Sequence, residues 1–230
     1  MKTIGIIGGL TWHSTIDYYR VLNETVAERL GGSSSAKILL YSVNFAEIKA
    51  LTFRQDWEGI SRIICSVAKQ LETAGADCLL IGANTMHYIA DAVQAAINIP
   101  LIHIADATGK AIVAKQLTKV ALLGTVYTME MGFYQEKLSA QCIETIVPDE
   151  DDREFINKAI YEEMGVGQFL SETKERFLMI IKKMVLQGAE GIILGCTEIP
   201  ILLKAAESSV TLFNTGHIHA NAGVDFALGD

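Results

Sequence analysis

Short apolar runs alternate along this chain with longer stretches that have helical periodicity. Runs at 3–8, 37–43 and 210–213 have the length and the flanking small or polar residues of strands. Between two of them, the segment from Trp57 to Ala74 places isoleucines, a valine and a leucine on one helical face. Strands that alternate with helices predict a parallel, doubly wound α/β sheet.

The same periodicity places the remaining elements. A short strand is predicted at Leu101–Ile104, directly after Pro100. Acidic residues at the start of a helix suit the positive end of its dipole, so the run from Asp149 to Asp152 is expected to cap one. Further helices are predicted at 14–30, 86–97, from about 106, at 173–187 and after 214.

Two stretches far apart in the chain repeat one pattern. Residues 188–198 align without a gap with residues 75–85, so that Cys196 falls opposite Ala83. Each stretch has a Gly-Ala-acid turn, an apolar run, and then a cluster of small, hydroxyl or amide residues. In open α/β sheets such a cluster lies at the carboxyl end of a strand, where ligands bind. We therefore expect the chemistry at these two positions.

A second pair of stretches indicates that the whole unit is duplicated. Residues 119–125 align with residues 3–9 at nearly the same offset as the first pair. We therefore expect two doubly wound lobes related by pseudo-twofold symmetry, with their strand ends facing a shared cleft that forms the active site. The first lobe is expected at 1–98 plus 209–230, and the second at 99–208.

The amino-acid composition limits the binding partners and the cellular compartment that we expect for this protein. The 230 residues include 27 acids and 19 bases, a net charge of -8, without a basic cluster, which argues against a nucleic-acid groove. The apolar amino terminus is short and interrupted by glycines, so it predicts a strand rather than a signal peptide, and no run is long enough to span a membrane. The four cysteines have neither metal-ligand spacing nor the density of a disulfide scaffold, so we expect a cytoplasmic protein without a metal.

Cys196 is the candidate for proton transfer. It follows a buried strand and precedes a helix, whose amino-terminal dipole is expected to stabilise the thiolate. Backbone N–H groups there and the hydroxyl of Thr197 are expected to hold a carboxylate, as Asn84 and Thr85 are in the other half. The alternative is a buried, inert thiol, and we adopt it for Cys65, Cys78 and Cys142.

The histidines are assigned secondary roles. His87 is expected to pack or hydrogen-bond at a helix start, His103 to end a strand, and His217 and His219 to belong to the cap of the last helix. A catalytic histidine is the less favoured alternative, although imidazole titrates near neutrality.

Several motifs occur together, in order, over the full length of the chain. They are Gly8-Gly9-Leu10-Thr11-Trp12, Asn84-Thr85-Met86-His87, His103-Ile104-Ala105-Asp106, Leu122-Leu123-Gly124-Thr125 with Tyr127-Thr128-Met129, and Gly195-Cys196-Thr197-Glu198. In these motifs the chain resembles the aspartate/glutamate racemase family of cofactor-independent amino-acid racemases, and within it the bacterial broad-specificity branch.

The resemblance implies a fold and a set of site residues. The family fold is two flavodoxin-like lobes around a cleft, usually in a homodimer, and the enzymes need no pyridoxal phosphate. By this matching, Cys196 corresponds to the second of two proton-transfer residues. The resemblance also implies that the substrate α-carboxylate binds Asn84, Thr85 and Thr197. Residues expected by the same matching to line the pocket are Gly9, Leu10, Thr125 and Thr128.

Three positions depart from the family pattern. Ala83 stands where the family has cysteine or threonine, and a methyl group can neither give nor take a proton, so the first catalytic position is expected to be non-functional. Thr52 stands where the resembling branch has a glutamine that recognises the substrate side chain. Gly165 stands where some members have a lysine for the side-chain carboxylate of aspartate.

These observations leave three hypotheses for function. The first is a thiol-dependent racemase of a small amino acid, aspartate or glutamate, impaired by Ala83. The second is one-base chemistry on the same scaffold, such as decarboxylation of a malonate-like dicarboxylic acid. The third is a catalytically silent amino-acid-binding protein. Under all three hypotheses we expect the protein to bind a small acid, and to bind neither nucleic acid nor a membrane.

Overall fold

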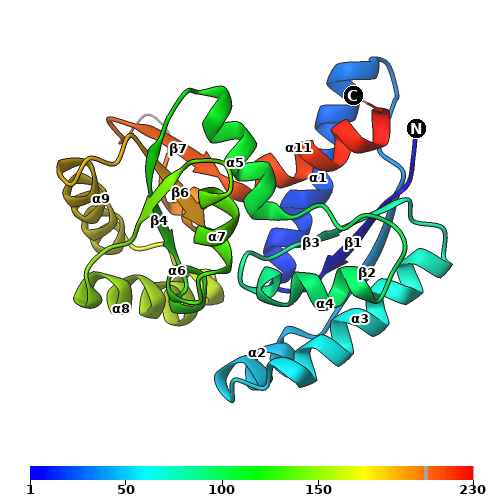
Figure 1. The fold of residues 1–230 in the computed structure, drawn as a ribbon, viewed down its shortest axis with the longest axis horizontal. Coiled ribbons are helices and arrows are strands. Elements are labelled where there is room, and N and C mark those ends of the chain that lie inside the picture. Colours follow the sequence, from blue (N-terminus) through cyan, green and yellow to red (C-terminus); the bar gives the residue numbers. More distant parts are fainter. Residues whose placement is uncertain (205–206, 230) are drawn as a thin grey trace. The chain divides into compact units, whose positions relative to one another are not determined.

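The computed structural model describes residues 1–204 and 207–229, and the chain divides into two compact units. Unit 1 comprises Met1–Ile104 and His219–Asp230, and unit 2 comprises Ala105–Ile218. Each unit contains its own parallel sheet (Figure 1). The lobe assignments that the sequence suggested for residues 205–206 and 230 lie outside the described residues.

The last strand belongs to a different unit from the one the sequence suggested. Residues 209–230 were expected in the first lobe, but β7 (Thr211–Asn214) pairs with β6 (Gly191–Gly195) in the sheet of unit 2. Only the chain from His219 onward returns to unit 1. An apolar run of this kind fits either sheet, so its pattern does not specify which neighbour it pairs with.

Unit 1 is built on a sheet with the strand order β2-β1-β3. In register, Ile4 lies beside Ile38 on one side and beside Cys78 on the other. The elements of this unit are β1 (Ile4–Gly8), α1 (Trp12–Leu30), β2 (Ile38–Ser42), α2 (Phe45–Phe53), α3 (Trp57–Thr73), β3 (Cys78–Ile81), η1 (Thr85–Ile89), α4 (Ala90–Ala95) and the part of α11 (Thr215–Leu228) from His219 onward.

Helices cover both faces of this sheet. Alternate residues of a strand point to opposite faces, so Ile7 of β1 packs in one core cluster, with side chains of α2, α3 and α4. Ile4 and Ile6 pack in a second cluster, with α1 and with Ala220 and Val224 of α11. The first unit is therefore a three-layer α/β/α structure.

Unit 2 has the strand order β5-β4-β6-β7, again parallel. Its elements are α5 (Ile104–Ala114, beginning at the last residue of unit 1), β4 (Lys119–Gly124), α6 (Val126–Glu130), α7 (Phe133–Ser139), β5 (Glu144–Ile146), α8 (Glu150–Lys158), the π-helical turn η2 (Ala159–Glu163), η3 (Met164–Val166), α9 (Ser171–Leu186), β6, α10 (Ile199–Leu202) and β7. The order β5-β4-β6 repeats the order β2-β1-β3, so the duplication seen in the sequence is present in the topology. The predicted α/β class with two parallel, doubly wound sheets is confirmed.

One local prediction was wrong, and one helix was missed. The run Leu101–Ile104 is no strand, because Leu101 makes only an isolated bridge to Leu79 and α5 already begins at Ile104. The helix α2 was not predicted, since of its nine residues only Ile48 and Thr52 are buried. Among the described residues, no helix is both long enough and apolar enough to cross a membrane.

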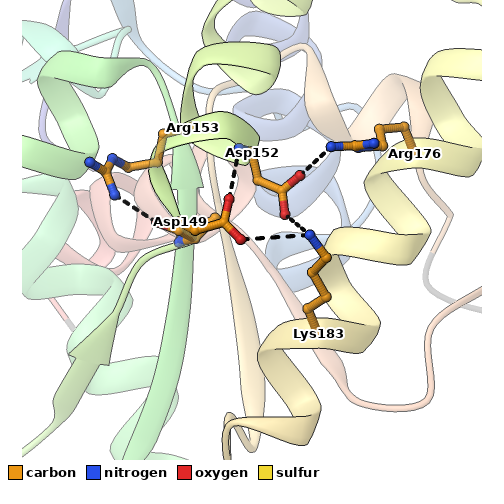
Figure 2. A network of polar contacts seen from close by, with 6 residues as sticks. Asp149, Asp152, Arg153, Arg176 and Lys183 are labelled. Carbon is orange, nitrogen blue, oxygen red and sulfur yellow. Dashed lines mark hydrogen bonds and ion pairs between the residues drawn. The ribbon is translucent and has the colours of Figure 1, made fainter.

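A buried carboxylate joins α8 to α9 in unit 2 (Figure 2). The side chain of Asp152 is fully buried, and its two oxygens accept hydrogen bonds from Arg176 at 2.7 Å and Lys183 at 2.6 Å. Asp149 caps α8 by accepting from the backbone N–H of Asp152 at 3.0 Å, and it lies 3.6 Å from the Lys183 ammonium. Burial alone raises the pKa of the Asp152 carboxyl, but the hydrogen bonds and charges of Lys183 and Arg176 bring it below its usual value.

Asp152→Asn is expected to destabilise the protein by about 2 kcal/mol, because two cations lose the carboxylate that they share while remaining half exposed to water. The melting temperature should fall by about 4–8 °C at pH 7. The folded-state pKa of Asp152 is lowered, so its contribution is present above the unfolded-state pKa of about 4 and is lost as the pH falls below it. The difference between variant and wild type should therefore shrink in acid, whereas Asp151→Asn, at the exposed neighbouring acid, should change little at any pH.

Candidate functional site

Cys196 lies at the carboxyl end of β6, an inner strand of the unit 2 sheet. It follows β6 directly, and its thiol donates a hydrogen bond to Oε2 of Glu198 at 3.0 Å. The hydroxyl of Thr197 donates to the same oxygen at 2.9 Å. Cys196 is 9% and Glu198 5% exposed. A thiol, a hydroxyl and a carboxylate therefore form a hydrogen-bonded cluster with little access to water.

The thiol of Cys196 is not stabilised as a thiolate, contrary to the expectation from the sequence. Burial raises its pKa well above the usual value, and the negative charge of Glu198 raises it further. Hydrogen bonds from the backbone of Glu198 and Thr197 act in the opposite direction but are weaker. The helix that follows, α10, has only four residues. The resting form is thus a protonated thiol whose hydrogen points at a carboxylate.

The predicted pocket residues Thr125 and Thr128 lie at the same edge of this sheet. Gly124 of β4 pairs with Gly195 of β6, so Thr125 ends its strand beside Cys196. Thr125 caps α6 by accepting from the backbone N–H of Thr128 at 3.3 Å, and the two hydroxyl oxygens are 3.2 Å apart. The structure therefore brings these residues together with Cys196 and Thr197 at one edge.

A distorted helix carries another residue near Cys196. The chain from Ala159 to Glu163 forms a π-helical turn, a feature often found at functional sites. Tyr161 lies on this turn, and burial, together with the neighbouring Cys196, raises the pKa of its phenol. Two residues after the turn, a Cβ on Gly165 would lie 2.8 Å from the carbonyl oxygen of Ile160. This backbone has no room for the lysine that the family resemblance suggests at 165.

Ala83 has the equivalent position in unit 1. The N–H of Gly82 donates to Ile7 of β1 at 2.9 Å, so Ala83 follows β3 at the carboxyl edge of the sheet. Asn84 and Thr85 come next and are 4% and 9% exposed. The structure therefore brings Ala83, where the family resemblance implies the first catalytic residue, together with the two expected carboxylate-binding residues at this edge.

Two further predicted residues lie at the end of β1. Gly9 has a φ of 77°, and a Cβ there would collide with the backbone of Val43, so only glycine fits. Its N–H donates to the hydroxyl of Thr15 at 2.8 Å. Leu10 is 6% exposed and belongs to the core beneath this edge. Both residues shape the edge near Ala83, Gly9 through its backbone and Leu10 through packing.

Thr52 is the predicted site residue for which the structure gives least support. It lies in α2, is 4% exposed, and its hydroxyl donates to the carbonyl of Ile48 in the same helix at 2.8 Å. A threonine hydroxyl has one hydrogen to donate. Thr52 could therefore contact a substrate only as an acceptor.

The sequence of the chain matches the Asp/Glu/hydantoin racemase family over residues 7–223. The chain belongs to this racemase family. It is 47% identical to a Yersinia pestis protein provisionally assigned as an Asp/Glu racemase, with a TM-score of 0.93 over 99% of this chain and 100% of the other. It is 37% identical to an aspartate racemase homologue from Pyrococcus horikoshii, with a TM-score of 0.86 over 99% and 100% of the two chains.

One relative of this chain has a name that states an activity. The broad-specificity amino-acid racemase RacX of Bacillus subtilis is 25% identical over 181 residues, which are 75% of this chain and 74% of RacX. Racemases are isomerases, so this chain is a member of an isomerase family. The resemblance to the aspartate/glutamate racemases noted from the sequence motifs is confirmed.

Sequence reasoning missed two residues of this site. Glu198 belongs to the motif Gly195-Cys196-Thr197-Glu198, but no function was predicted for it. The signal was its spacing, because a short turn can bring an acid into contact with a cysteine two positions earlier. Tyr161 left no signal in the sequence, because its position depends on the π-helical turn that continues α8.

Proposed function

We propose that this protein is a cofactor-independent amino-acid racemase of the aspartate/glutamate type in which the thiol of Cys196 moves the α-proton. The observation that carries the proposal is the 3.0 Å hydrogen bond from Cys196 to the buried carboxylate of Glu198, in a chain of the racemase family. A thiol alone is a weak base at neutral pH, and a carboxylate that can take its proton makes it a stronger one.

The proposed proton transfer has two coupled movements. The thiol proton of Cys196 passes to Oε2 of Glu198, and the sulfur takes the proton from the substrate α-carbon. The electron pair of the broken C–H bond moves into the substrate carboxylate, which becomes enediolate-like. The amide of Asn84 and the hydroxyl of Thr85 would stabilise the added negative charge. The hydroxyl of Thr197 donates to Glu198 and would first have to turn away from it to donate to the substrate. We infer that both half-sites act on one substrate, as the family resemblance implies.

Ala83 leaves one face of the α-carbon without a thiol. Returning the proton from Cys196 restores the starting enantiomer, and inversion needs water or a weaker acid on the other face. We therefore expect solvent deuterium to enter one enantiomer with retention, while racemisation is slower by about 10²- to 10⁴-fold.

The test is incubation of each enantiomer of aspartate and glutamate in D₂O, followed by chiral chromatography and mass spectrometry. Deuterium at the α-carbon of one enantiomer supports the proposal. Absence of α-deuterium in all four substrates would remove it, and a thermal shift with these amino acids under the same conditions would then favour a silent binding protein.

Glu198→Gln is expected to slow α-deuterium exchange by about 10²-fold, because an amide cannot take the thiol proton. The amide still offers an oxygen to Thr197, so the local fold should persist. Glu154→Gln, at an exposed acid of α8, is the matched control and should exchange at the wild-type rate. Equal rates for the Glu198 and Glu154 variants would show that the carboxylate has no part in the transfer.

One-base decarboxylation remains a second candidate, favoured by the single thiol opposite Ala83. An enzyme of this kind needs one proton donor, and a protonated Cys196 is suited to donate. Release of carbon dioxide from substituted malonates, together with no α-deuterium in amino acids, would favour it over racemisation.

We further propose that the protein is a homodimer. Trp12, Ile16 and Tyr19 form a stripe along one face of α1 and are 60%, 57% and 56% exposed. Apolar residues grouped in this way are typical of interfaces. Analytical ultracentrifugation should give a dimer for the wild type and a monomer for Ile16→Glu; a wild-type monomer would contradict the proposal.

A further inference from the structure

In unit 1, the ring of His87 packs against the rings of His103 and His219, close to Ala83. The centroid of His87 lies 4.7 Å from that of His103 and 5.3 Å from that of His219, with the rings edge to face. His87 and His219 are 1% and 0% exposed. Neither is used in the proposed proton transfer, so their position needs a separate explanation.

The hydrogen bonds of His219 determine where its proton lies. Its Nε2 is 2.7 Å from the carbonyl oxygen of Ile102, and its Nδ1 is 2.7 Å from the hydroxyl of Tyr18. A carbonyl oxygen only accepts, so Nε2 carries the hydrogen. Burial and the neighbouring His87 lower the pKa of His219 to about 3, which keeps the ring neutral. Nδ1 is therefore the acceptor and the Tyr18 hydroxyl is the donor.

His87 has the opposite tautomer. Its Nδ1 is 2.9 Å from the carbonyl oxygen of Ala83 and therefore carries the hydrogen. Burial and the neighbouring His103 lower the pKa of His87 well below the usual value, so Nε2 is unprotonated. This Nε2 is buried and makes no hydrogen bond of good geometry in the described part of the chain. The Ile102 carbonyl interacts weakly with the His87 ring but accepts its hydrogen bond from Nε2 of His219.

A buried nitrogen without a partner is costly, and an apolar side chain would avoid that cost. The imidazole is therefore useful at 87 for its other nitrogen, which holds the Ala83 carbonyl. The backbone N–H of His87 also donates to the carbonyl of Asn84 at 3.0 Å. Both bonds from one residue reach back to the segment that contains Asn84 and Thr85.

We propose that His87 is a positioning residue that fixes the backbone of residues 83–85 through the bond from its Nδ1–H to the Ala83 carbonyl. In this way it holds Asn84 and Thr85 ready for the amino-acid carboxylate before substrate arrives. The role of Asn84 and Thr85 in binding the carboxylate rests on the proposed function. The tautomer of His87 is inferred from its hydrogen bond to Ala83 and does not depend on that function.

The first experiment measures KM and kcat for α-deuterium exchange in three variants. In His87→Asn the side-chain amide nitrogen stands near the place of Nδ1 and can donate to Ala83, whereas in His87→Gln it stands near the place of Nε2. His87→Leu fills the space without donating. We expect KM within about threefold of wild type for asparagine and about tenfold higher for glutamine and leucine, with kcat changed little.

The order of the variants separates positioning from packing. If His87 only fills space, leucine should be tolerated best and asparagine, the smallest of the three, worst. That order, or equal KM values for all three variants in an active enzyme, would overturn the proposal. Inactivity of the wild type itself would count against the proposed function instead.

The second experiment uses the wild-type protein and does not depend on activity. Selective ¹⁵N labelling of histidine and long-range ¹H–¹⁵N correlation should show His87 protonated at Nδ1 and His219 protonated at Nε2, unchanged between pH 8 and pH 5. A proton on Nε2 of His87, or titration of His87 within this range, would overturn the proposal even if the variants fail to fold.

Discussion

Replacement of Cys196 by alanine is expected to lower α-deuterium exchange and racemisation by about 10³-fold or more, to the background rate. The sulfur is the atom proposed to take the α-proton, and the neighbouring Glu198 carboxylate reaches the substrate through it. Glu198 keeps its hydrogen bond from Thr197 in this variant, so the strand end should stay folded.

Two controls make this result specific. Cys65→Ala removes a half-buried thiol from α3, at a distance in sequence from the site, and should leave exchange unchanged. The melting temperature of Cys196→Ala should stay close to that of the wild type. Exchange at the wild-type rate in a folded Cys196→Ala protein would show that another group takes the proton.

Replacement of Ala83 by cysteine is expected to raise racemisation by about 10²- to 10⁴-fold, because a second thiol can then protonate the opposite face of the α-carbon. Ala83 is partly exposed at the edge of the unit 1 sheet, and the added sulfur is small. Ala83→Ser places an oxygen near the position of the sulfur in Ala83→Cys but adds no thiol. Its gain in racemisation rate should therefore be much smaller.

The double variant gives the sharper stereochemical result. With Ala83→Cys and Cys196→Ala together, the single thiol lies on the other half-site, so deuterium should enter the opposite enantiomer from the one labelled by the wild type. If Ala83→Cys gains no racemisation and the double variant labels the same enantiomer as the wild type, the equivalence of the two half-sites is wrong.

The repeat in the sequence predicted the central architecture correctly. Residues 75–85 and 188–198 contain β3 and β6, and each of these strands pairs with the first strand of its unit, β1 or β4, although β6 also pairs with β7. Strand positions are recoverable in this way because a buried strand must be apolar and must end where the chain turns. The run at 101–104 failed because four apolar residues fit a strand, a loop or a helix start equally well.

The chemistry of the site was harder to predict than the fold. The helix-dipole argument for Cys196 considers only the neighbouring backbone, whereas the pKa of the thiol depends mainly on burial and on the carboxylate of Glu198. One of the histidines, His219, shows the same limit. His219 is not a cap residue but lies within α11, where it accepts from Tyr18, 201 positions away in the sequence. Local patterns contain no information about such contacts.

The pairing of Cys196 with Glu198 also bears on how the protein withstands oxidants. Peroxide oxidises the thiolate form of cysteine, and it oxidises solvent-exposed cysteines before buried ones. Cys196 is buried and protonated, whereas Cys142 is exposed. Under oxidative stress the surface thiol should form sulfenic acid first, and the sulfur proposed for proton transfer should be spared.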